Sequence, residues 1–327
     1  MRGASESGNE NLCQATQCAM GTVMTHKATG PRAEDSLAAV CREVARLEGL
    51  LSRFLPGSDV NRVNRSAGKA SERVSRETYD VLSQAAEFSS SFSGCLDVTI
   101  GPLATLWRIA RESSARPDKA SIKQVLPLVN FRDLVLDPRH RSAGLRKAGQ
   151  SVDLGGIGKG FAGDRVLEVY KRYGISSACS NLGGNVVTLG GKPDGSPWHI
   201  GIQHPRLEDR VIGSVSVVGQ TVVTSGDYQR YFVDSQGKRH HHILDPQTGY
   251  PADSGLISVS VVSDRSIAAD ALSTILFVAG MEKGLAFLSG FPQADAVLVD
   301  SDLQVYVTPG LRTHFQADEG IHVTVLD

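Results

Sequence analysis

Five glycines fall within twelve residues of this chain, in the segment DLGGIGKGFAGD from Asp153 to Asp164. A segment so rich in glycine is typical of a turn, because glycine adopts backbone torsions that other residues avoid. The residues before it, Gln150 to Leu154, have the pattern of a strand. From Asp164 to Tyr173 the apolar residues return to helical spacing. We therefore predict a strand, a glycine-rich turn and a helix, in that order.

Gly158, Gly160 and Gly163 match the GxGxxG fingerprint of dinucleotide-binding folds. A Rossmann fold also needs an acidic residue about 20 positions further on to bind ribose, and that region reads CSNLGGN. A P-loop is excluded, because Lys159 is followed by glycine rather than Ser or Thr. Two interpretations stay open. Backbone amides, the helix N-terminus and Lys159 hold a phosphate, or the glycines serve a tight turn.

Outside this segment, helices and strands are predicted in no regular alternation. Helical spacing extends over Ala33–Leu51, starts again after an N-cap at Ser75, and returns over Ser266–Ala279. The predicted strands are Asn185–Leu189, Trp198–Gln203, Gly213–Thr224 and Ile257–Ser263, with a hairpin across Asp300–Asp302. This mixture predicts an α+β fold of mixed, largely antiparallel sheets with packed helices, forming a single compact unit.

Composition narrows the class of function. We expect residues 1–18 to be a flexible N-terminal segment and residues 19–327 to be one domain with a substantial core, because 41% of the 327 residues are hydrophobic. The net charge of -1 gives no electrostatic basis for binding nucleic acid. No apolar run reaches the roughly 20 residues of a membrane span, so no transmembrane segment is expected. Of the function classes considered, an activity on small molecules agrees best with this composition.

The cysteines and the first residues bear on the cellular compartment. Five cysteines without a CxxC pair indicate neither a disulfide framework nor a zinc site. The first residues lack the hydrophobic core of a signal peptide. As the sequence stands we expect a cytoplasmic protein. The alternative, if a leader was removed, is a periplasmic protein or a membrane-anchored lipoprotein.

Asp270 and Thr274 stand four residues apart in the helix predicted from Ser266, so a carboxylate and a hydroxyl share one helix face among apolar residues. Such oxygen ligands suit Mg²⁺, which usually also bridges to substrate phosphate. The alternative is a capping or buried, hydrogen-bonded aspartate.

Three consecutive histidines, His240 to His242, cannot converge on one metal ion in an extended segment, because alternate side chains point to opposite faces. One of them is a candidate base, although a structural histidine is the more ordinary reading. Thr224, Ser225 and Gly226 follow a predicted strand and could hold phosphate oxygens. Ser225 is not expected to be a nucleophile, because no GxSxG elbow surrounds it.

Eight blocks follow one another along the chain in a recognisable order. They are AMGT from Ala19, SRFLPGSDVNRVN from Ser52, GCLDVTIGPLATLW from Gly94, VDLGGIGKGFAGD from Val152, SNLGGN from Ser180, TSGDYQRYF from Thr224, HHILDPQTGYP from His241 and ADALST from Ala269. Through these blocks the chain resembles the FAD:protein FMN transferase family, also called the ApbE family. The resemblance extends from about Met20 to the final strands and implies an ApbE-like, T-fold-like architecture.

The resemblance implies a magnesium-dependent enzyme with FAD as its substrate. It would split the FAD pyrophosphate, attach FMN through a phosphoester bond to a Ser or Thr hydroxyl of an acceptor flavoprotein, and release AMP. By similarity, His242 is the base that deprotonates the acceptor hydroxyl, and Mg²⁺ is bound by Asp270, Thr274 and the carbonyl of Gly156. The residues implied to contact FAD are Met20, Phe54, Leu96, Asp97, Val98, Asp153, Lys159, Ser225 and Leu244, with Asn64 as a further pocket residue.

Three positions depart from the family pattern. Phe54 stands where the family often has a stacking tyrosine, Gly156 replaces a more usual Ala or Thr, and Ser273 sits where some members have a second metal-site aspartate. Two alternatives to the transferase stay open: an FAD pyrophosphatase that releases FMN and AMP, and a non-catalytic flavin-binding protein.

Overall fold

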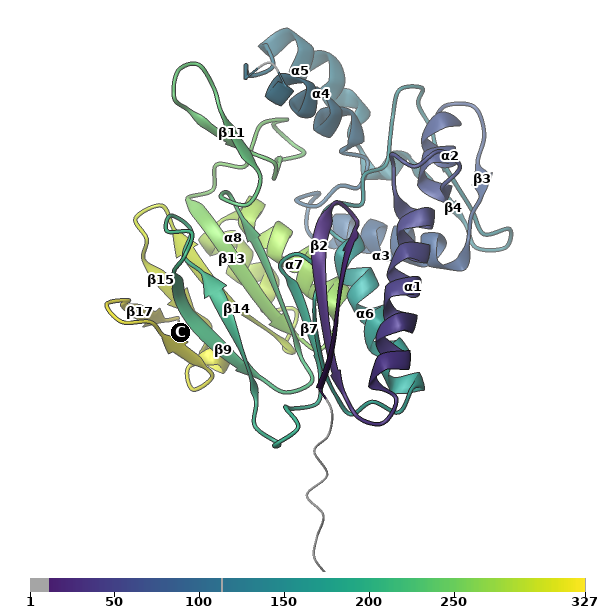
Figure 1. Ribbon diagram of the computed structural model, residues 1–327. Helices are drawn as coiled ribbons and strands as arrows, with labels where there is room; N and C mark the ends of the chain where they lie inside the picture. Colours follow the sequence, from purple (N-terminus) through teal and green to yellow (C-terminus); the bar gives the residue numbers. More distant parts are fainter. Residues whose placement is uncertain (1–11, 113, 327) are drawn as a thin grey trace, which may run out of the picture.

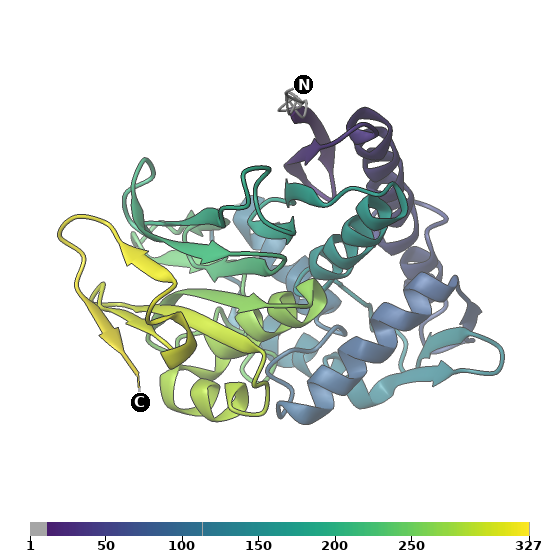
Figure 2. The ribbon, with the colours of Figure 1, turned by 90° about the horizontal axis from the view of Figure 1, so that it is seen from below.

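A nine-stranded sheet runs through the centre of the computed structural model, which describes residues 12–112 and 114–326 (Figure 1). Neighbouring strands are antiparallel, except that the last two pair in parallel. In sheet order the strands are β1 (Leu12–Ala19), β2 (Thr22–Thr29), β6 (Ser177–Asn181), β7 (Asn185–Leu189), β10 (Thr221–Gly226), β13 (Leu256–Ser263), β14 (Ala294–Asp300), β15 (Val305–Val307) and β17 (Val323–Val325). Viewed from below, the purple β1–β2 hairpin and the yellow C-terminal strands lie at opposite ends of the molecule (Figure 2).

Three smaller sheets surround the central one. One contains β16 (Phe315–Ala317), β9 (Val211–Val217) and β8 (Trp198–Gln203) in that order. Another contains β3 (Glu72–Arg73), β5 (Ser142–Leu145) and β4 (Leu134–Asp137). The third is the two-stranded hairpin of β11 (Tyr231–Val233) and β12 (Arg239–His241), which stands beyond the end of the central sheet at the upper left of Figure 1.

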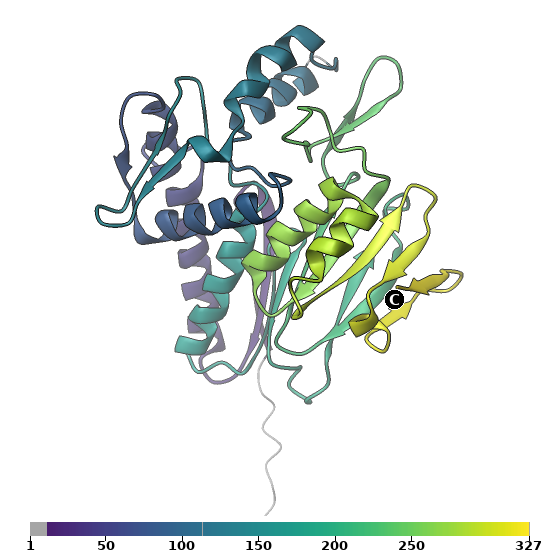
Figure 3. The same cartoon turned by 180° about the vertical axis from the view of Figure 1, so that it is seen from behind.

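Helices cover one face of the central sheet, and α7 and α8, in yellow-green, lie in front of it when the molecule is seen from behind (Figure 3). The helices are α1 (Ala33–Leu51), α2 (Asp59–Arg65), α3 (Arg76–Ser91), α4 (Gly101–Glu112), α5 (Lys119–Val125), α6 (Gly158–Arg172), α7 (Ser266–Ala279) and α8 (Met281–Leu288), with 3-10 turns at Leu126–Leu128, Phe131–Asp133 and Pro309–Leu311. Within the described ranges, no helix combines the length and apolar character needed to cross a membrane.

Hydrophobic cores lie on both faces of the central sheet. The larger one joins the sheet to the helices, and α1 contributes the stripe Leu37, Val40, Val44, Leu47 and Leu51 that its sequence spacing predicts. On the other face, valines of β13 and β14 pack against Ile202, Val215 and Val217 of the β8–β9 sheet. A third cluster under α4 includes Trp107 and Leu244. This burial fixes the sheet and helices as the frame on which the loops at one end are held.

The predicted fold class, α+β with largely antiparallel sheets in one compact unit, is confirmed. The helices Ala33–Leu51 and Ser266–Ala279 have the predicted bounds, and the Ser75 hydroxyl accepts the predicted capping bond from the Thr78 amide at 3.2 Å. The hairpin across Asp300–Asp302 is present between β14 and β15.

Four local predictions were wrong. Residues 150–154 form no strand, because the side chain of Asn64 occupies both backbone groups of Val152, and only an isolated bridge joins Ser151 to Ile100. The helix after the glycines begins at Gly158 rather than Asp164. The predicted strand 213–224 is two strands, β9 and β10, separated by a turn. Residues 12–18, expected to be flexible, belong to β1, and residues 1–11 lie outside the described residues.

Candidate active site

A cavity of about 1090 Å³ opens between the end of the central sheet, the β11–β12 hairpin and α4. Twelve of the thirteen predicted site residues line it: Met20, Phe54, Leu96, Asp97, Asp153, Gly156, Lys159, Ser225, His242, Leu244, Asp270 and Thr274. The exception is Val98, whose side chain is buried in the hydrophobic core. Segments that are far apart in sequence therefore meet at one concave surface.

The floor of the cavity is built by a close crossing of α6 and α7. A Cβ added at Gly160 would lie 2.6 Å from the Asp270 Cβ, and one added at Gly163 would lie 2.4 Å from the Ser266 Oγ. Both separations are far below van der Waals contact, so these two glycines let the helices approach. Part of the glycine-rich segment thus serves helix packing, an interpretation that the sequence alone had not offered.

Each of these helices is capped by an aspartate from the other. Neither has a capping side chain at its own N-cap residue. Asp270 on α7 accepts a hydrogen bond from the Gly160 amide at 2.7 Å. Asp164 on α6 accepts bonds from the Ser266 and Ile267 amides at 2.7 and 3.1 Å. We call this arrangement the reciprocal caps. It satisfies amides that a helix leaves unpaired at its start and fixes α7 against α6.

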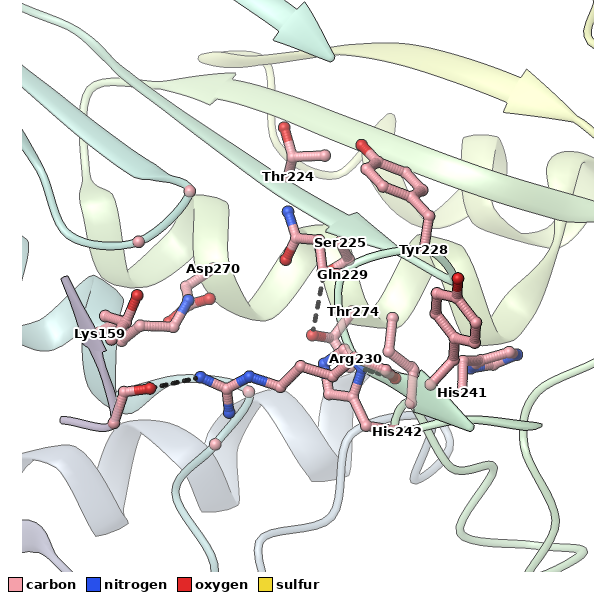
Figure 4. A pocket seen from close by; sticks show the side chains of 18 of the residues that line it. Lys159, Thr224, Ser225, Tyr228, Gln229, Arg230, His241, His242, Asp270 and Thr274 are labelled. Carbon is pink, nitrogen blue, oxygen red and sulfur yellow. Dashed lines mark hydrogen bonds between the residues drawn. The ribbon is translucent and has the colours of Figure 1, made fainter. Parts of the chain in front are cut away.

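Oxygen atoms from three segments gather at the cavity floor. Asp270 and Thr274 lie on the same face of α7, as their spacing predicts (Figure 4). Gly156 is adjacent, because a Cβ placed there would be 3.3 Å from Thr274 Oγ1. Ser225 Oγ lies 3.4 Å from the same hydroxyl and 2.8 Å from Ser273 Oγ. Among residues 12–112 and 114–326, no three His, Cys, Asp or Glu side chains cluster as metal ligands. A cation here would depend on carboxylate, hydroxyl and carbonyl oxygens together.

Lys159 brings positive charge to the same floor, beside Asp270 (Figure 4). Its ammonium group donates a hydrogen bond to the Asn185 side-chain carbonyl. Burial lowers the pKa of Lys159, and the nearby Asp270 carboxylate opposes that shift. The same amide of Asn185 has a buried Nδ2 without a hydrogen-bond partner in the described structure. Asn185 therefore holds the lysine in place without neutralising it.

The three consecutive histidines have different environments. His240 Nε2 is bonded to Asp234 at 2.8 Å, and His241 Nε2 donates to the Ala252 carbonyl at 3.0 Å, so both are structural. His242 faces the cavity, and its Nδ1 lies 3.1 Å from the Arg230 carbonyl oxygen. Because a carbonyl only accepts, Nδ1 carries the proton and Nε2 is left as an acceptor.

Surrounding protein lowers the pKa of His242 to about 4, mainly through burial and then through nearby cations, against the opposing effect of the Arg230 carbonyl. The ring nevertheless has surface open to the cavity, so its desolvation is greatest when a ligand fills that space. At neutral pH the imidazole is uncharged and able to accept a proton. This geometry matches the requirement for a general base.

Two predicted contact residues already use their carboxylates within the protein. Asp97 accepts bonds from the Thr99 amide and hydroxyl and from the Phe131 amide, all at 2.7 to 2.8 Å, while burial raises its pKa. Asp153 is ion-paired with Arg53 at 2.6 Å and accepts from the Gly155 amide at 2.8 Å. These carboxylates shape the cavity wall by fixing the loops that carry them.

The apolar predicted residues take complementary positions around the wall. Leu96 and Leu244 are buried, whereas Phe54 is 63% exposed. Met20 occupies the turn of the β1–β2 hairpin with a positive φ of 50°, and its amide donates to the Glu48 carboxylate at 2.8 Å. The cavity thus combines an apolar wall with a charged floor.

Asn64, expected as a further pocket residue, does not line the cavity but holds Val152 through two backbone bonds of 2.6 and 3.0 Å. Sequence reasoning missed several other residues that build the site. Asn185 and Arg53 position Lys159 and Asp153. Arg230, within the block TSGDYQRYF, extends through the cavity from the His242 side toward Lys159 (Figure 4). Their presence in the conspicuous blocks was the only available signal, because their partners are distant in sequence.

Together, the fold and the site define a class: α+β proteins in which a histidine and a lysine face an oxygen-rich floor at one end of an antiparallel sheet. Comparison with known proteins then specifies the family. The family described as the ApbE family matches residues 20–298, and this chain belongs to it.

Relatives and solved structures agree with that membership. The FAD:protein FMN transferase of Klebsiella pneumoniae is 38% identical over 293 residues, covering 89% of this chain and 90% of the relative. The protein of the same name from Treponema pallidum is 34% identical, covering 89% and 85%. The crystal structure of the ApbE protein from Thermotoga maritima superposes with a TM-score of 0.85 at 29% identity, covering 93% of this chain and 99% of that one. The expected family and fold are thereby confirmed.

Proposed function

We propose that this chain is an FAD:protein FMN transferase, the activity for which its relatives are named. The observation that carries the proposal is the uncharged His242, held with Nε2 free, in the same cavity as Lys159 and the oxygens of Asp270 and Thr274. The cavity volume of about 1090 Å³ is at the upper limit of small-molecule sites, roughly 300–1,000 Å³, and suits a ligand as large as FAD.

For the metal, we propose Mg²⁺ held by Asp270, Thr274 and the Gly156 carbonyl. The donor set fits this ion, because all three groups offer hard oxygen atoms and none is a thiolate or imidazole. The cavity also leaves room for the waters that Mg²⁺ usually retains. When bound, the ion would supply positive charge opposite the pyrophosphate.

The remaining chemistry belongs to residues of this chain. Nε2 of His242 takes the proton of the acceptor Ser or Thr hydroxyl. The hydroxyl oxygen then forms a bond to the FMN phosphorus, the bond from that phosphorus to the bridging oxygen breaks, and the bridging oxygen leaves with AMP. Lys159 stabilises negative charge on the pyrophosphate during this exchange. The proton ends on His242 and passes to solvent.

We propose that the isoalloxazine and adenine rings lie against the apolar wall of Met20, Phe54, Leu96 and Leu244. The exposed ring of Phe54 offers a face for stacking, with Arg53 and Arg108 at 5.1 and 5.7 Å from its centroid. Asp97 and Asp153 then act by fixing the wall, and Ser225 lies near the phosphates. Val98 is left out of this set, because its side chain does not reach the cavity.

The deciding experiment incubates the full chain with FAD, Mg²⁺ and a flavin-accepting protein, and detects covalent FMN by in-gel fluorescence and AMP by chromatography. The proposal expects both products in equal amounts. Free FMN and AMP that an acceptor does not suppress would assign a pyrophosphatase instead. FAD binding without cleavage would assign a flavin-binding protein.

For the compartment we propose the cytoplasm, which cell fractionation tests against a periplasmic or membrane-anchored location.

A further inference from the structure

Of the arginines that line the cavity, Arg53, Arg108, Arg206 and Arg239 each have a carboxylate within 4.0 Å, whereas Arg111 and Arg230 have none among the described residues. Arg53 pairs with Asp153 at 2.6 Å, and Arg206 pairs with Asp227 at 2.7 Å. No carboxylate of the described residues lies within 4.0 Å of the Arg230 guanidinium. A guanidinium without a carboxylate partner is available to bind an anion from outside the chain.

One hydrogen bond fixes where this guanidinium lies. Its Nη2 donates to the Gly21 carbonyl at 3.2 Å, in the turn of the β1–β2 hairpin. A guanidinium has five N–H donors, so the remaining ones are available to the cavity. The side chain is exposed there and is close enough to affect the electrostatics of both Lys159 and His242. The backbone carbonyl of the same residue orients His242.

We propose that Arg230 is a catalytic residue whose guanidinium binds the phosphoryl group transferred from FAD. This inference rests on the proposed function and adds a residue that touches the reacting atoms. The guanidinium contacts non-bridging oxygens of the FMN phosphate while the acceptor oxygen bonds to phosphorus and the bridging oxygen departs with AMP. Lys159 and Arg230 then both stabilise the negative charge that develops during transfer.

The planar fork of arginine explains why this position needs more than a positive charge. Arginine binds phosphate through two parallel N–H donors, whereas lysine offers a point charge. The bond to Gly21 holds the fork in one orientation before the substrate arrives. Such preorganisation lets a donor act on charge in the transition state without reorganisation.

The test compares Arg230→Gln and Arg230→Lys with wild type, with Arg210→Gln as the matched control. Arg210 pairs with Asp318 at 3.3 Å and does not line the cavity. We expect Arg230→Gln to lower kcat by about 10²-fold or more, since loss of one transition-state donor typically costs about 10²–10³. Arg230→Lys should retain more activity, with kcat lowered by roughly 10-fold. Arg210→Gln should match wild type.

Two further measurements separate catalysis from a structural role. FAD affinity of the full-length variants, measured by flavin fluorescence, should weaken by a smaller factor than kcat falls. Guanidinium ion added at millimolar concentration to Arg230→Ala should restore part of the rate. No such rescue is expected if Arg230 only stabilises the hairpin turn. Thermal unfolding verifies that each variant is folded.

The proposal is overturned if Arg230→Gln keeps kcat within about threefold of wild type, or if the whole effect lies in FAD affinity. Absence of guanidinium rescue together with a lowered melting temperature also overturns it, in favour of a structural role. These results differ from failure of the proposed function. In that case wild type itself would form neither covalent FMN nor AMP.

Discussion

Replacing His242 by Gln should separate flavin transfer from FAD binding. Glutamine can still donate a hydrogen bond to the Arg230 carbonyl but cannot take up a proton at neutral pH. General bases contribute about 10²–10⁴ in rate, so we expect the rate of FMN transfer to fall about 10³-fold, a barrier increase of about 4 kcal/mol. FAD affinity should change little, because the ring is one of many cavity-lining groups.

The pH dependence of the wild type tests the same assignment. Proton uptake requires the neutral ring, and the surroundings lower the pKa of His242 to about 4. Activity should therefore persist at pH 5 to 6 and fall only as the pH drops toward about 4, well below the usual histidine value of about 6.5. A plot of kcat against pH reports the pKa of His242 in the enzyme–substrate complex, where the ligand completes the desolvation of the ring.

The assay measures covalent FMN fluorescence and AMP release across the pH range in which the protein is folded, with His140→Gln as the control. His140 is an exposed histidine paired with Asp137 outside the cavity. The reasoning is refuted if His242→Gln retains most of the transfer rate, or if FAD binding and transfer are lost equally. An acidic limb near pH 6.5 that survives in His242→Gln would assign the titration to another group.

Three other perturbations have defined outcomes. Burial of His26 lowers its pKa from 6.5 to about 4, so the unfolded chain binds the proton more tightly and the free energy of unfolding should fall by about 3 kcal/mol in total as the pH drops from 6.5 to 4. Urea denaturation of His26→Gln should lack this component, and an unchanged slope would contradict the assignment. Asp270→Ala and Thr274→Val should each abolish metal-dependent turnover and weaken Mg²⁺ binding in calorimetry, and full activity in both would exclude the metal site. Asp164→Ala should lower the free energy of unfolding by about 1–2 kcal/mol and also weaken Mg²⁺ binding, since it releases one of the reciprocal caps; unchanged Mg²⁺ binding would show that the two are independent.

Local sequence patterns correctly predicted those elements in which buried residues recur at the regular spacing of a helix or a strand. The stripe of α1 and the capping serine of α3 are both local features, and both were predicted correctly. The segment at residues 150–154 failed for the opposite reason. Its apolar character reflects burial, but its backbone bonds go to Asn64 and Val98, which no local pattern identifies. Helix α6 begins at Gly158, before the predicted Asp164, because Asp270 of α7 accepts a hydrogen bond from the Gly160 amide in its first turn.

The site could be predicted as a set of residues but not as a set of interactions. The family resemblance named Asp153 and Lys159, yet their partners Arg53 and Asn185 emerge only from the fold. The same resemblance implied that Val98 contacts FAD together with Leu96 and Asp97, although its side chain is buried in the core. Neighbours in sequence share a segment, but the twist of a loop decides which of them face a ligand.

The reciprocal caps couple local unfolding of the two helix N-termini to the structure of the site. The amides of Gly160, Ser266 and Ile267 are each bonded to a side chain of the opposite helix, so none is protected unless α6 and α7 are together. Their hydrogen exchange should therefore follow a single opening event, rather than the gradual fraying expected of helix ends. Asp270 loses its amide partner in that same event. The residue proposed to bind Mg²⁺ and the first turns of two helices thus share one local unfolding equilibrium.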